Sequence, residues 1–350
     1  MDAELREQLQ SEIWSLESRL STLRREALLP QISDELEDID TRLASLPVSI
    51  EKIRTRGYAF KKDLEARAEA LREQWPELRV RVEGETEDLK RTLKVALDRA
   101  EREFASLRAT FQRSPSSAQA ILASCQSTIE GLEDKVQAAQ ENIEGMIDTF
   151  RQSVDQTVKE VEDIAWMFDQ LDEASFGLRP QENPIEATEA VYLTEPKLKG
   201  ILYLTDQRLI FERKEDVVTK KVLFIPTKKK RVQEMVLDVP IGMVEECIGE
   251  EKGFILHKEI LGLKFSPKAP VREARFQLKE DSSAWRALIG RVLSGEIEKE
   301  RAIPKEEVPP EEVKEIPAKC PFCGAALPQE IVRGMTTITC EYCGNVIRLQ

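Results

Sequence analysis

The sequence predicts a multidomain α + β protein, in which a long helical rod precedes a β-rich domain and a small cysteine-rich tail. Three observations predict this order. Apolar residues in the first half recur at spacings of three and four, the middle changes to period two, and four cysteines stand in two pairs near the end. The 350 residues suffice for two or three domains. Charged residues make up 33% of the chain and aromatic residues 6%, which favours a rod with small modules over one large core.

Residues 1–175 are predicted to form a coiled-coil helical rod. Apolar spacings of three and four alternate with charged residues between them, a pattern typical of a coiled coil. The pattern is interrupted at Pro30 and Pro47, and it slips by one step at Val154, as a stutter does. The longest regular run consists of Leu122, Cys125, Ile129, Leu132, Val136, Ala139, Ile143, Met146 and Phe150.

Two helices of similar length, residues 49–112 and 116–173, are expected on either side of Ser114-Pro115. Serine caps a helix well, and proline suits the first helical position. Trp75-Pro76 and Gly84 are expected to kink or interrupt the first of these helices. Similar lengths around a tight turn favour an antiparallel hairpin within one chain. A parallel dimer through the same apolar stripe satisfies the pattern too, so self-association stays open.

Four other residues of the rod are interpreted as packing residues rather than ligands. Three are the tryptophans Trp14, Trp75 and Trp166, and the fourth is Cys125, which lies on the apolar stripe. A free cysteine in such a place behaves as a small apolar side chain.

Charge and hydropathy predict a cytoplasmic protein. The formal net charge is −13, and the acidic excess lies mainly in residues 1–175, which argues against broad binding of that region to nucleic acid or anionic membrane. No apolar run approaches the roughly 20 residues that span a bilayer. The start M-D-A-E-L-R-E-Q is acidic, unlike a signal peptide, and no lipidation motif is seen.

After a linker at residues 176–185, the period becomes two. Short β-rich runs then follow one another between turn residues, as in an all-β sheet that bends into a barrel or sandwich. Asp281-Ser282-Ser283 is expected to open an amphipathic helix that ends at Gly295. The runs are 190–193, 200–205, 208–213, 220–225, 234–239, 244–249, 254–257, 261–265 and 272–278.

The segment G-I-L-Y-L-T-D-Q-R-L-I-F, residues 200–211, resembles the first hairpin of GRAM domains and of bacterial PH-like domains. Residues 238–247, D-V-P-I-G-M-V-E-E-C, are similar to a later turn of these domains. The resemblance covers about residues 186–294. It implies a PH-like β-barrel with a C-terminal helix, which binds lipid headgroups or protein partners without catalysis. Most matched residues are expected in the hairpin core, namely Leu202, Leu204, Leu209 and Phe211.

Six cations surround one expected strand and loop: Lys220, Lys221, Lys228, Lys229, Lys230 and Arg231. They form a candidate site for an anionic ligand, such as a phospholipid headgroup or an acidic protein. At about 1 kcal/mol per cation near an anionic leaflet, six cations give at most about 6 kcal/mol. The alternative is a solvated loop with no ligand.

Residues 295–317 are rich in Glu, Lys and Pro and are expected to be a flexible linker. Beyond them, C-P-F-C-G and C-E-Y-C-G-N place Cys320, Cys323, Cys340 and Cys343 in two C-x2-C pairs. In a reducing compartment such pairs indicate a metal site. Residues 318–350 resemble a zinc ribbon. The expected cofactor is therefore one structural Zn²⁺, and a rubredoxin-type iron centre with the same ligands stays open.

No residue pattern indicates catalysis. His257 is the only histidine and lies at the end of an expected strand, and no phosphate-binding glycine loop or nucleophile elbow occurs. The sequence therefore predicts a non-enzymatic cytoplasmic adaptor or scaffold whose rod, PH-like module and ribbon bind partner proteins. The alternative is a peripheral membrane protein whose PH-like domain binds anionic lipid through residues 220–231. A nucleic-acid partner is disfavoured, since the ribbon carries few cations.

Overall fold

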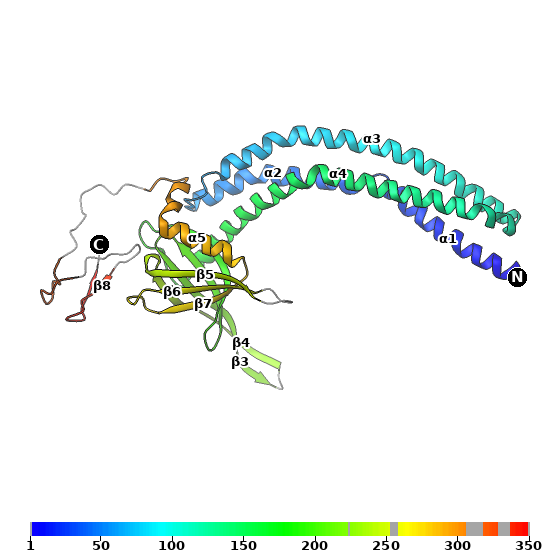
Figure 1. Ribbon diagram of the computed structural model, residues 1–350. Coiled ribbons are helices and arrows are strands. Elements are labelled where there is room, and N and C mark those ends of the chain that lie inside the picture. The colour runs from blue at the N-terminus through cyan, green and yellow to red at the C-terminus, as the bar shows by residue number, and fades with distance from the viewer. Residues whose placement is uncertain (1, 223–224, 253–257, 306–317, 328–336, 349–350) are drawn as a thin grey trace. The chain divides into compact units, whose positions relative to one another are not determined.

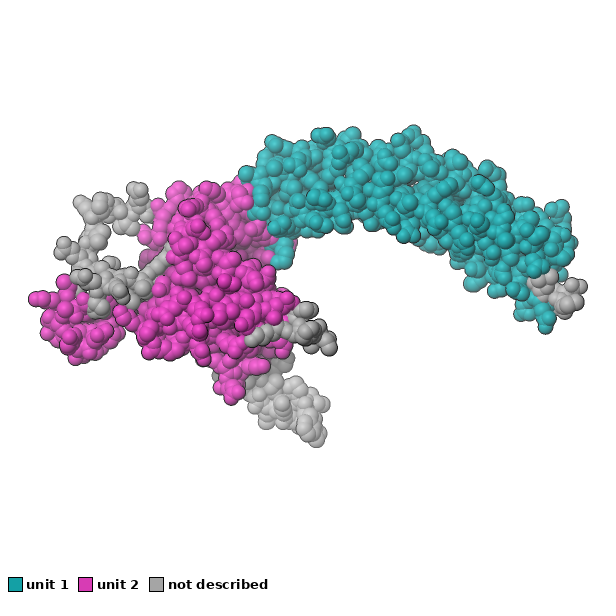
Figure 2. Space-filling view, viewed as in Figure 1, with its two compact units in different colours: residues 1–48, 66–159 teal, residues 49–65, 160–350 magenta. Residues whose placement is uncertain are grey.

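The computed structural model describes residues 2–222, 225–252, 258–305, 318–327 and 337–348 (Figure 1). It divides into two compact units (Figure 2). Unit 1 consists of residues 1–48 and 66–159, and unit 2 consists of residues 49–65 and 160–350. Among the described residues, no helix is both long and apolar enough to cross a membrane.

Four helices form the first half of the chain: α1 (Asp2–Glu26), α2 (Pro30–Thr55), α3 (Leu64–Arg113) and α4 (Pro115–Asp172). Pro115 is the first residue of α4, and the Ser114 hydroxyl accepts a hydrogen bond from the Ser117 amide at 3.4 Å, as predicted. The expected interruption of the apolar pattern at Pro47 is wrong, because Pro47 lies inside α2 and the buried residues continue with Ile50 and Ile53. Buried neighbours Leu46 and Ile50 hold the helix there, since tertiary packing supplies most helical stability.

Unit 1 is a three-layered helical bundle rather than a two-helix hairpin alone. Helices α3 and α4 are antiparallel neighbours, as predicted, and lie side by side in Figure 1. The helix pair α1–α2 adds a third layer. Arg19 contacts Glu133 at 2.6 Å, and Arg42, further along the chain, contacts Asp155, which is also further along the chain, at 2.5 Å. Because both partners advance in the same direction, α1 and α2 run parallel to α4.

The same third layer runs antiparallel to α3. Glu17 pairs with Arg108 at 3.2 Å, and Arg24 pairs with Glu101 at 2.5 Å. A step of seven residues forward in α1 thus matches a step of seven residues backward in α3. One continuous core of buried apolar residues joins α1, α2, α3 and α4, and it includes Leu23 and Ile129. The predicted apolar stripe is therefore buried within a single chain.

The connection between α2 and α3 belongs to unit 2. The expected helix 49–112 is interrupted here, because α2 ends at Thr55 and α3 begins at Leu64. Arg54 stabilises the break. Its guanidinium donates to the carbonyls of Tyr58, Phe60 and Lys61 at 2.6–2.9 Å and pairs with Glu65 at 2.7 Å. The guanidinium of Arg54 thus donates hydrogen bonds to main-chain carbonyls that follow the end of α2.

Seven strands form one antiparallel sheet in the order β4-β3-β2-β1-β7-β6-β5. Their bounds are β1 (Pro184–Tyr192), β2 (Leu198–Thr205), β3 (Arg208–Val222), β4 (Ile225–Pro240), β5 (Val244–Lys252), β6 (Lys258–Phe265) and β7 (Glu273–Leu278), and a short 3-10 helix η1 (Ile241–Met243) joins β4 to β5. The β-rich middle is thereby confirmed. The expected runs 208–213 and 234–239 belong to longer strands, and 254–257 lies outside the described residues.

The predicted closed barrel is not found, since β4 and β5 remain unpaired with each other among the described residues. Helix α5 (Ser282–Ser294) packs against β5. A Cβ atom added at Gly249 in β5 would lie 2.6 Å from the Ser282 carbonyl oxygen, so glycine permits this close approach. The start of α5 is therefore in close contact with β5, one of the two edge strands of the sheet.

The ends of α5 match their sequence signals. The Asp281 carboxylate accepts from the amides of Ser283 and Ala284 at 2.7 and 3.3 Å, and Gly295 adopts a left-handed φ of 77°. The apolar face Trp285, Leu288, Ile289 and Val292 is buried, as predicted. In the sheet, the expected core residues Leu202, Leu204, Leu209 and Phe211 are buried as well.

The predicted flexible linker at residues 295–317 begins with ordered structure. A 3-10 helix, η2 (Glu296–Glu300), buries Ile297, and the amide of Ala302 donates to the carbonyl of Ala59 at 2.8 Å. Arg301 lies over the Phe60 ring at 4.6 Å and pairs with Asp206 at 2.8 Å. This segment therefore packs against the α2–α3 connection, and residues 306–317 lie outside the described part of the chain.

Candidate functional site

The four cysteines of the tail lie on two turns of nearly identical geometry. The Gly324 amide donates to the Cys320 carbonyl at 2.8 Å, and the Gly344 amide donates to the Cys340 carbonyl at 2.8 Å. Both glycines have left-handed φ angles, 74° and 71°, which other residues rarely adopt. The glycine after each C-x2-C pair thus shapes the turn. Strands β8 (Thr337–Thr339) and β9 (Val346–Arg348) pair around the second turn.

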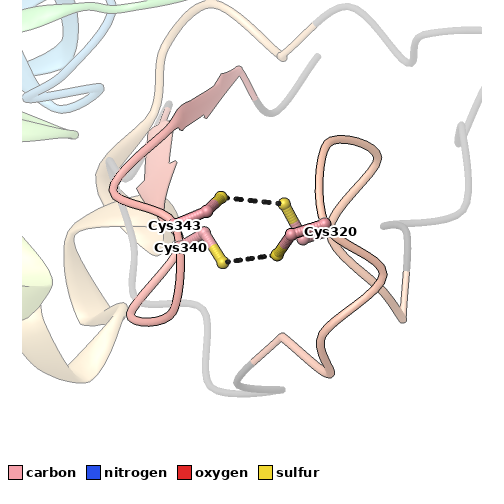
Figure 3. Close-up of side chains that lie close together, drawn as sticks. Cys320, Cys340 and Cys343 are labelled. Carbon is pink, nitrogen blue, oxygen red and sulfur yellow. Dashed lines mark hydrogen bonds between the residues drawn. The ribbon is translucent and has the colours of Figure 1, made fainter.

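The two turns bring the four sulfur atoms together, as Figure 3 shows for three labelled cysteines. The Cys320 and Cys343 sulfurs are 3.7 Å apart, the Cys323 and Cys340 sulfurs are 3.6 Å apart, and all four lie within 4.8 Å of one another. Zn–S bonds of ~2.3 Å in a tetrahedron require sulfur separations of about 3.8 Å. The predicted ligand set therefore forms a cluster that can hold one metal ion.

The surroundings of the cluster shift the pKa values of two thiols in opposite directions. A hydrogen bond from the Ala325 amide lowers the pKa of Cys323, but burial and the neighbouring cysteines raise it to about 12. Backbone N–H groups of Cys343 and Tyr342 lower the pKa of the Cys340 thiol to about 7, and the Asn345 side-chain amide lies 3.5 Å from the Cys343 sulfur. Donors that point at sulfur stabilise its charged form. Within the described residues, the apolar core around the cluster is small: Leu327, Ile338 and Ile347 with the two buried cysteines Cys320 and Cys340.

Each turn also exposes an aromatic side chain between its two cysteines. Phe322 is 64% exposed and Tyr342 is 79% exposed. They occupy equivalent positions in C-P-F-C and C-E-Y-C. Neither ring contributes to the core, so both are available for contacts outside the module.

The six basic positions lie on two paired strands rather than around a loop. Lys220 and Lys221 belong to β3, and Lys228, Lys229, Lys230 and Arg231 belong to β4. In the strand register Lys220 is opposite Lys228, and Arg231 is opposite Asp216. Arg231 is exposed and pairs with Glu173 at 3.1 Å. The side chains at positions 220–230 lie outside the described residues, so their role as an anionic-ligand site stays a prediction.

The residues expected to pack in the rod differ in outcome. Cys125 is buried, and burial raises the pKa of its thiol to about 11, as befits an unreactive core residue. Trp75 is buried, stacks on Phe150 at 5.2 Å and donates to Asp40. Trp14 is 71% exposed, so its expected burial is wrong. Trp166 is half-buried in unit 2, and His257 lies outside the described residues.

Sequence reasoning missed a buried charge cluster in unit 2. Arg208 donates to Glu182 at 2.7 and 2.9 Å and to Asp238 at 2.8 Å, and its side chain is 4% exposed. It also donates to the Gly177 carbonyl at 2.7 Å. Gly177 and Glu182 lie in the expected linker 176–185, which this cluster ties to the sheet. No sequence signal marks the partners, because they are 26 or more residues apart.

Comparison with known proteins assigns no family. No family model matches the chain, and no curated protein matches it. Among solved structures, the C-terminal domain of an unknown protein from Leishmania infantum has 11% identity and a TM-score of 0.21, and covers 33% of this chain and 87% of its own. The DH/PH domains of p115-RhoGEF have 13% identity and a TM-score of 0.22, with coverages of 84% and 94%. Autoinhibited Vav1 has 11% identity and a TM-score of 0.24, with coverages of 79% and 57%. These scores are too low to assign the fold of this chain.

Proposed function

We propose that this chain is a non-enzymatic adaptor, in which a helical bundle carries a PH-like module and a structural zinc ribbon that contact partner proteins. The observation that carries the proposal is the four-cysteine cluster with its exposed aromatic side chains. Four thiolates complete a tetrahedral site and leave no open position for a substrate, so the metal would act structurally. The exposed rings Phe322 and Tyr342 then remain as the surface through which the module acts.

The sheet supports the PH-like part of the proposal. Strands β1–β4 form one meander, β5–β7 form a second, β1 pairs with β7, and one amphipathic helix follows. This layout agrees with the GRAM-like hairpin at residues 200–211. A module of this kind binds ligands without making or breaking covalent bonds. We therefore include the sheet domain in the proposed adaptor function.

The cofactor we propose is one Zn²⁺ per chain, held by Cys320, Cys323, Cys340 and Cys343. The sulfur separations fit Zn–S geometry, and the core around the cluster is too small to fold the tail unaided. Metal analysis of the purified, reduced protein should give one zinc. Cys340→Ser should release the metal and unfold only the tail, with the other units unchanged by hydrogen exchange. An iron content near one per chain, or no metal, contradicts the zinc assignment.

The adaptor role is tested at the exposed rings. Phe322→Ser with Tyr342→Ser should reduce the set of proteins crosslinked to the chain in its native cells, while zinc content stays at one. A matched control is Val346→Ser, which removes an exposed apolar side chain from β9 without touching the two turns. If the double variant keeps every crosslinked partner, the tail does not serve as a contact surface.

A second candidate is a peripheral membrane protein. The observation that favours it is the strand register, which places lysine positions 220 and 228 opposite each other on paired strands. Changing Lys228, Lys229, Lys230 and Arg231 to Glu should then abolish sedimentation with anionic vesicles, and salt should weaken wild-type binding because exposed charges are screened over ~8 Å. Wild-type protein that ignores anionic vesicles at low salt contradicts this candidate.

A further inference from the structure

Unit 2 contains a groove on the surface of the sheet. It has a volume of about 480 Å³ and lies between the end of α4 and strands β1, β2 and β7. Ala190 pairs with Gly200 of β2 and with Leu278 of β7, and these three residues and their neighbours in the sequence line the groove. The side chains that matter most are Trp166, Gln170, Val191, Lys199, Lys214 and Lys279.

Three lysines line this groove, Lys199 of β2, Lys214 of β3 and Lys279 directly after β7, against one lining carboxylate, Glu189. Lys199 is exposed and has no ion-pair or hydrogen-bond partner in the described part of the chain. Lys279 pairs with Glu189 at 3.2 Å, and both side chains are largely exposed. Lys214 is held by Gln170 and Glu173, each at 2.8 Å. Exposed ion pairs contribute little, so Lys279 can exchange its partner at small cost.

Trp166 gives the groove an aromatic wall. It is half-buried, and its indole N–H has no acceptor among the described residues. Two other tryptophans do have one, since Trp75 donates to Asp40 and Trp285 donates to Glu280. A tryptophan with an apolar body in a groove and a free N–H can stack on a ligand and donate to it.

We propose that Trp166, Lys199, Lys214 and Lys279 bind a phosphate-bearing molecule in this groove. Ammonium groups act as point charges toward phosphate, and the indole supplies both a donor and a flat apolar surface. The ligand therefore combines a phosphate with a planar or apolar portion. The groove volume suits a small organic molecule. Such a phosphate belongs either to a soluble compound or to a lipid headgroup.

The groove shares no lining residue with the metal centre or with the basic positions 220–231, although Glu173 contacts both Lys214 and Arg231. The full chain is titrated calorimetrically with phenyl phosphate as the soluble probe. It is also sedimented with phosphatidylcholine vesicles that contain or lack phosphatidic acid. Lys199→Ala should weaken binding about tenfold, the loss expected for one charge-assisted contact. Trp166→Phe keeps the apolar ring but removes the N–H, and should weaken binding by a smaller factor.

The matched control is Lys268→Ala, which removes an exposed lysine of unit 2 that lies outside the groove. It should bind both probes like the wild type. Binding of phenyl phosphate identifies a soluble ligand class, and binding of phosphatidic acid vesicles alone identifies a lipid headgroup. The proposal is overturned if neither probe binds, or if Lys199→Ala and Lys268→Ala bind equally well.

Discussion

The helical bundle of unit 1 and the sheet domain of unit 2 differ in where their ion pairs lie. In unit 1, ion pairs join neighbouring helices at the surface: the Arg24 and Glu101 side chains are 62% and 34% exposed. Unit 2 has exposed ion pairs as well, such as Lys279 with Glu189, but it also contains a buried one: the Arg208 and Glu182 side chains are 4% and 0% exposed. The bundle therefore relies on its apolar stripe, whereas the sheet domain contains charges that must stay paired.

The difference has an energetic consequence. Surface pairs contribute ~0–1 kcal/mol, because water and salt screen them. Breaking a buried pair costs ~3–5 kcal/mol, because a charge is left in a poorly solvated place. Removing an arginine from a surface pair of unit 1 should therefore have a small effect, and removing Arg208 from the buried pair of unit 2 should have a large one.

The largest expected effect is that of Arg208→Ala. It leaves the fully buried Glu182 without a guanidinium partner, whereas the half-buried Asp238 keeps only Arg179, at 3.5 Å. We expect unit 2 to lose about 3–5 kcal/mol of unfolding free energy. Hydrogen exchange followed by mass spectrometry measures this in peptides of β2 and β3, with peptides of α3 as the internal reference.

The control for Arg208 removes the charge on both sides. Arg208→Met with Glu182→Gln leaves no uncompensated charge at this pair and should recover part of the lost stability. If Arg208→Ala alone leaves exchange in β2 and β3 unchanged, the buried pair does not stabilise unit 2.

In the bundle, the comparable loss should come from an apolar residue. Ile143 of α4 is fully buried in the core of unit 1. Ile143→Ala should cost about 2–5 kcal/mol, from lost burial and the remaining cavity. Exchange should rise in α3 and α4 while β2 and β3 stay protected. Uniform loss across both units would show that the two units unfold as one.

The same contrast explains what the sequence could predict. Helical periodicity is local, so it identified buried residues such as Ile129 and Ile143 correctly. It could not tell which helix covers them, because a three-four stripe fits a hairpin, a dimer or a third helix equally well. The layer formed by α1 and α2 depends on contacts such as that of Arg19 with Glu133, which are 114 residues apart. The hairpin prediction was therefore incomplete rather than wrong.

The candidate sites show the same difference between local patterns, which the sequence reveals, and contacts between distant residues, which it does not. The four cysteines were predictable, because the glycine turns that aim their sulfurs lie within each short motif. The groove was not predictable, since Trp166 comes from α4, Lys199 from β2 and Lys279 from the residue after β7, which are far apart in the sequence. Trp166 was interpreted as a packing residue of the rod. Its place in a helical segment gives no information about which strands lie beside it. The prediction of a closed barrel was wrong because the number of strands does not specify whether the two edge strands, β4 and β5, pair with each other.

Unit 2 also contains a buried carboxyl that should make its stability depend on pH. Burial raises the pKa of Glu186 to about 7, and nearby Glu280 and Asp163 act in the same direction, while Lys61 at 4.0 Å opposes them. The unfolded carboxyl ionises near ~4.3. Folding therefore favours the protonated form, so stability is fully present below ~4.3 and declines as pH rises to about 7.

Glu186→Gln tests this assignment, because the amide stays neutral. The variant should match the wild type at low pH and exceed it by up to about 3 kcal/mol above pH 7. Urea unfolding followed across this range measures the difference. A difference that does not change with pH would show that Glu186 is ionised in the folded protein throughout.

The smallest expected effect is that of Arg24→Ala in α1. Arg24 bridges to Glu101 of α3, but its side chain is largely exposed, so the pair is screened and its side chains are costly to order. We expect a loss of less than about 1 kcal/mol, which decreases further as salt is added. Hydrogen exchange in α3 peptides at two salt concentrations measures it beside Ile143→Ala. A loss as large as that of Arg208→Ala would mean that the bundle, like the sheet domain, depends on its ion pairs, and the contrast between the two units would fail.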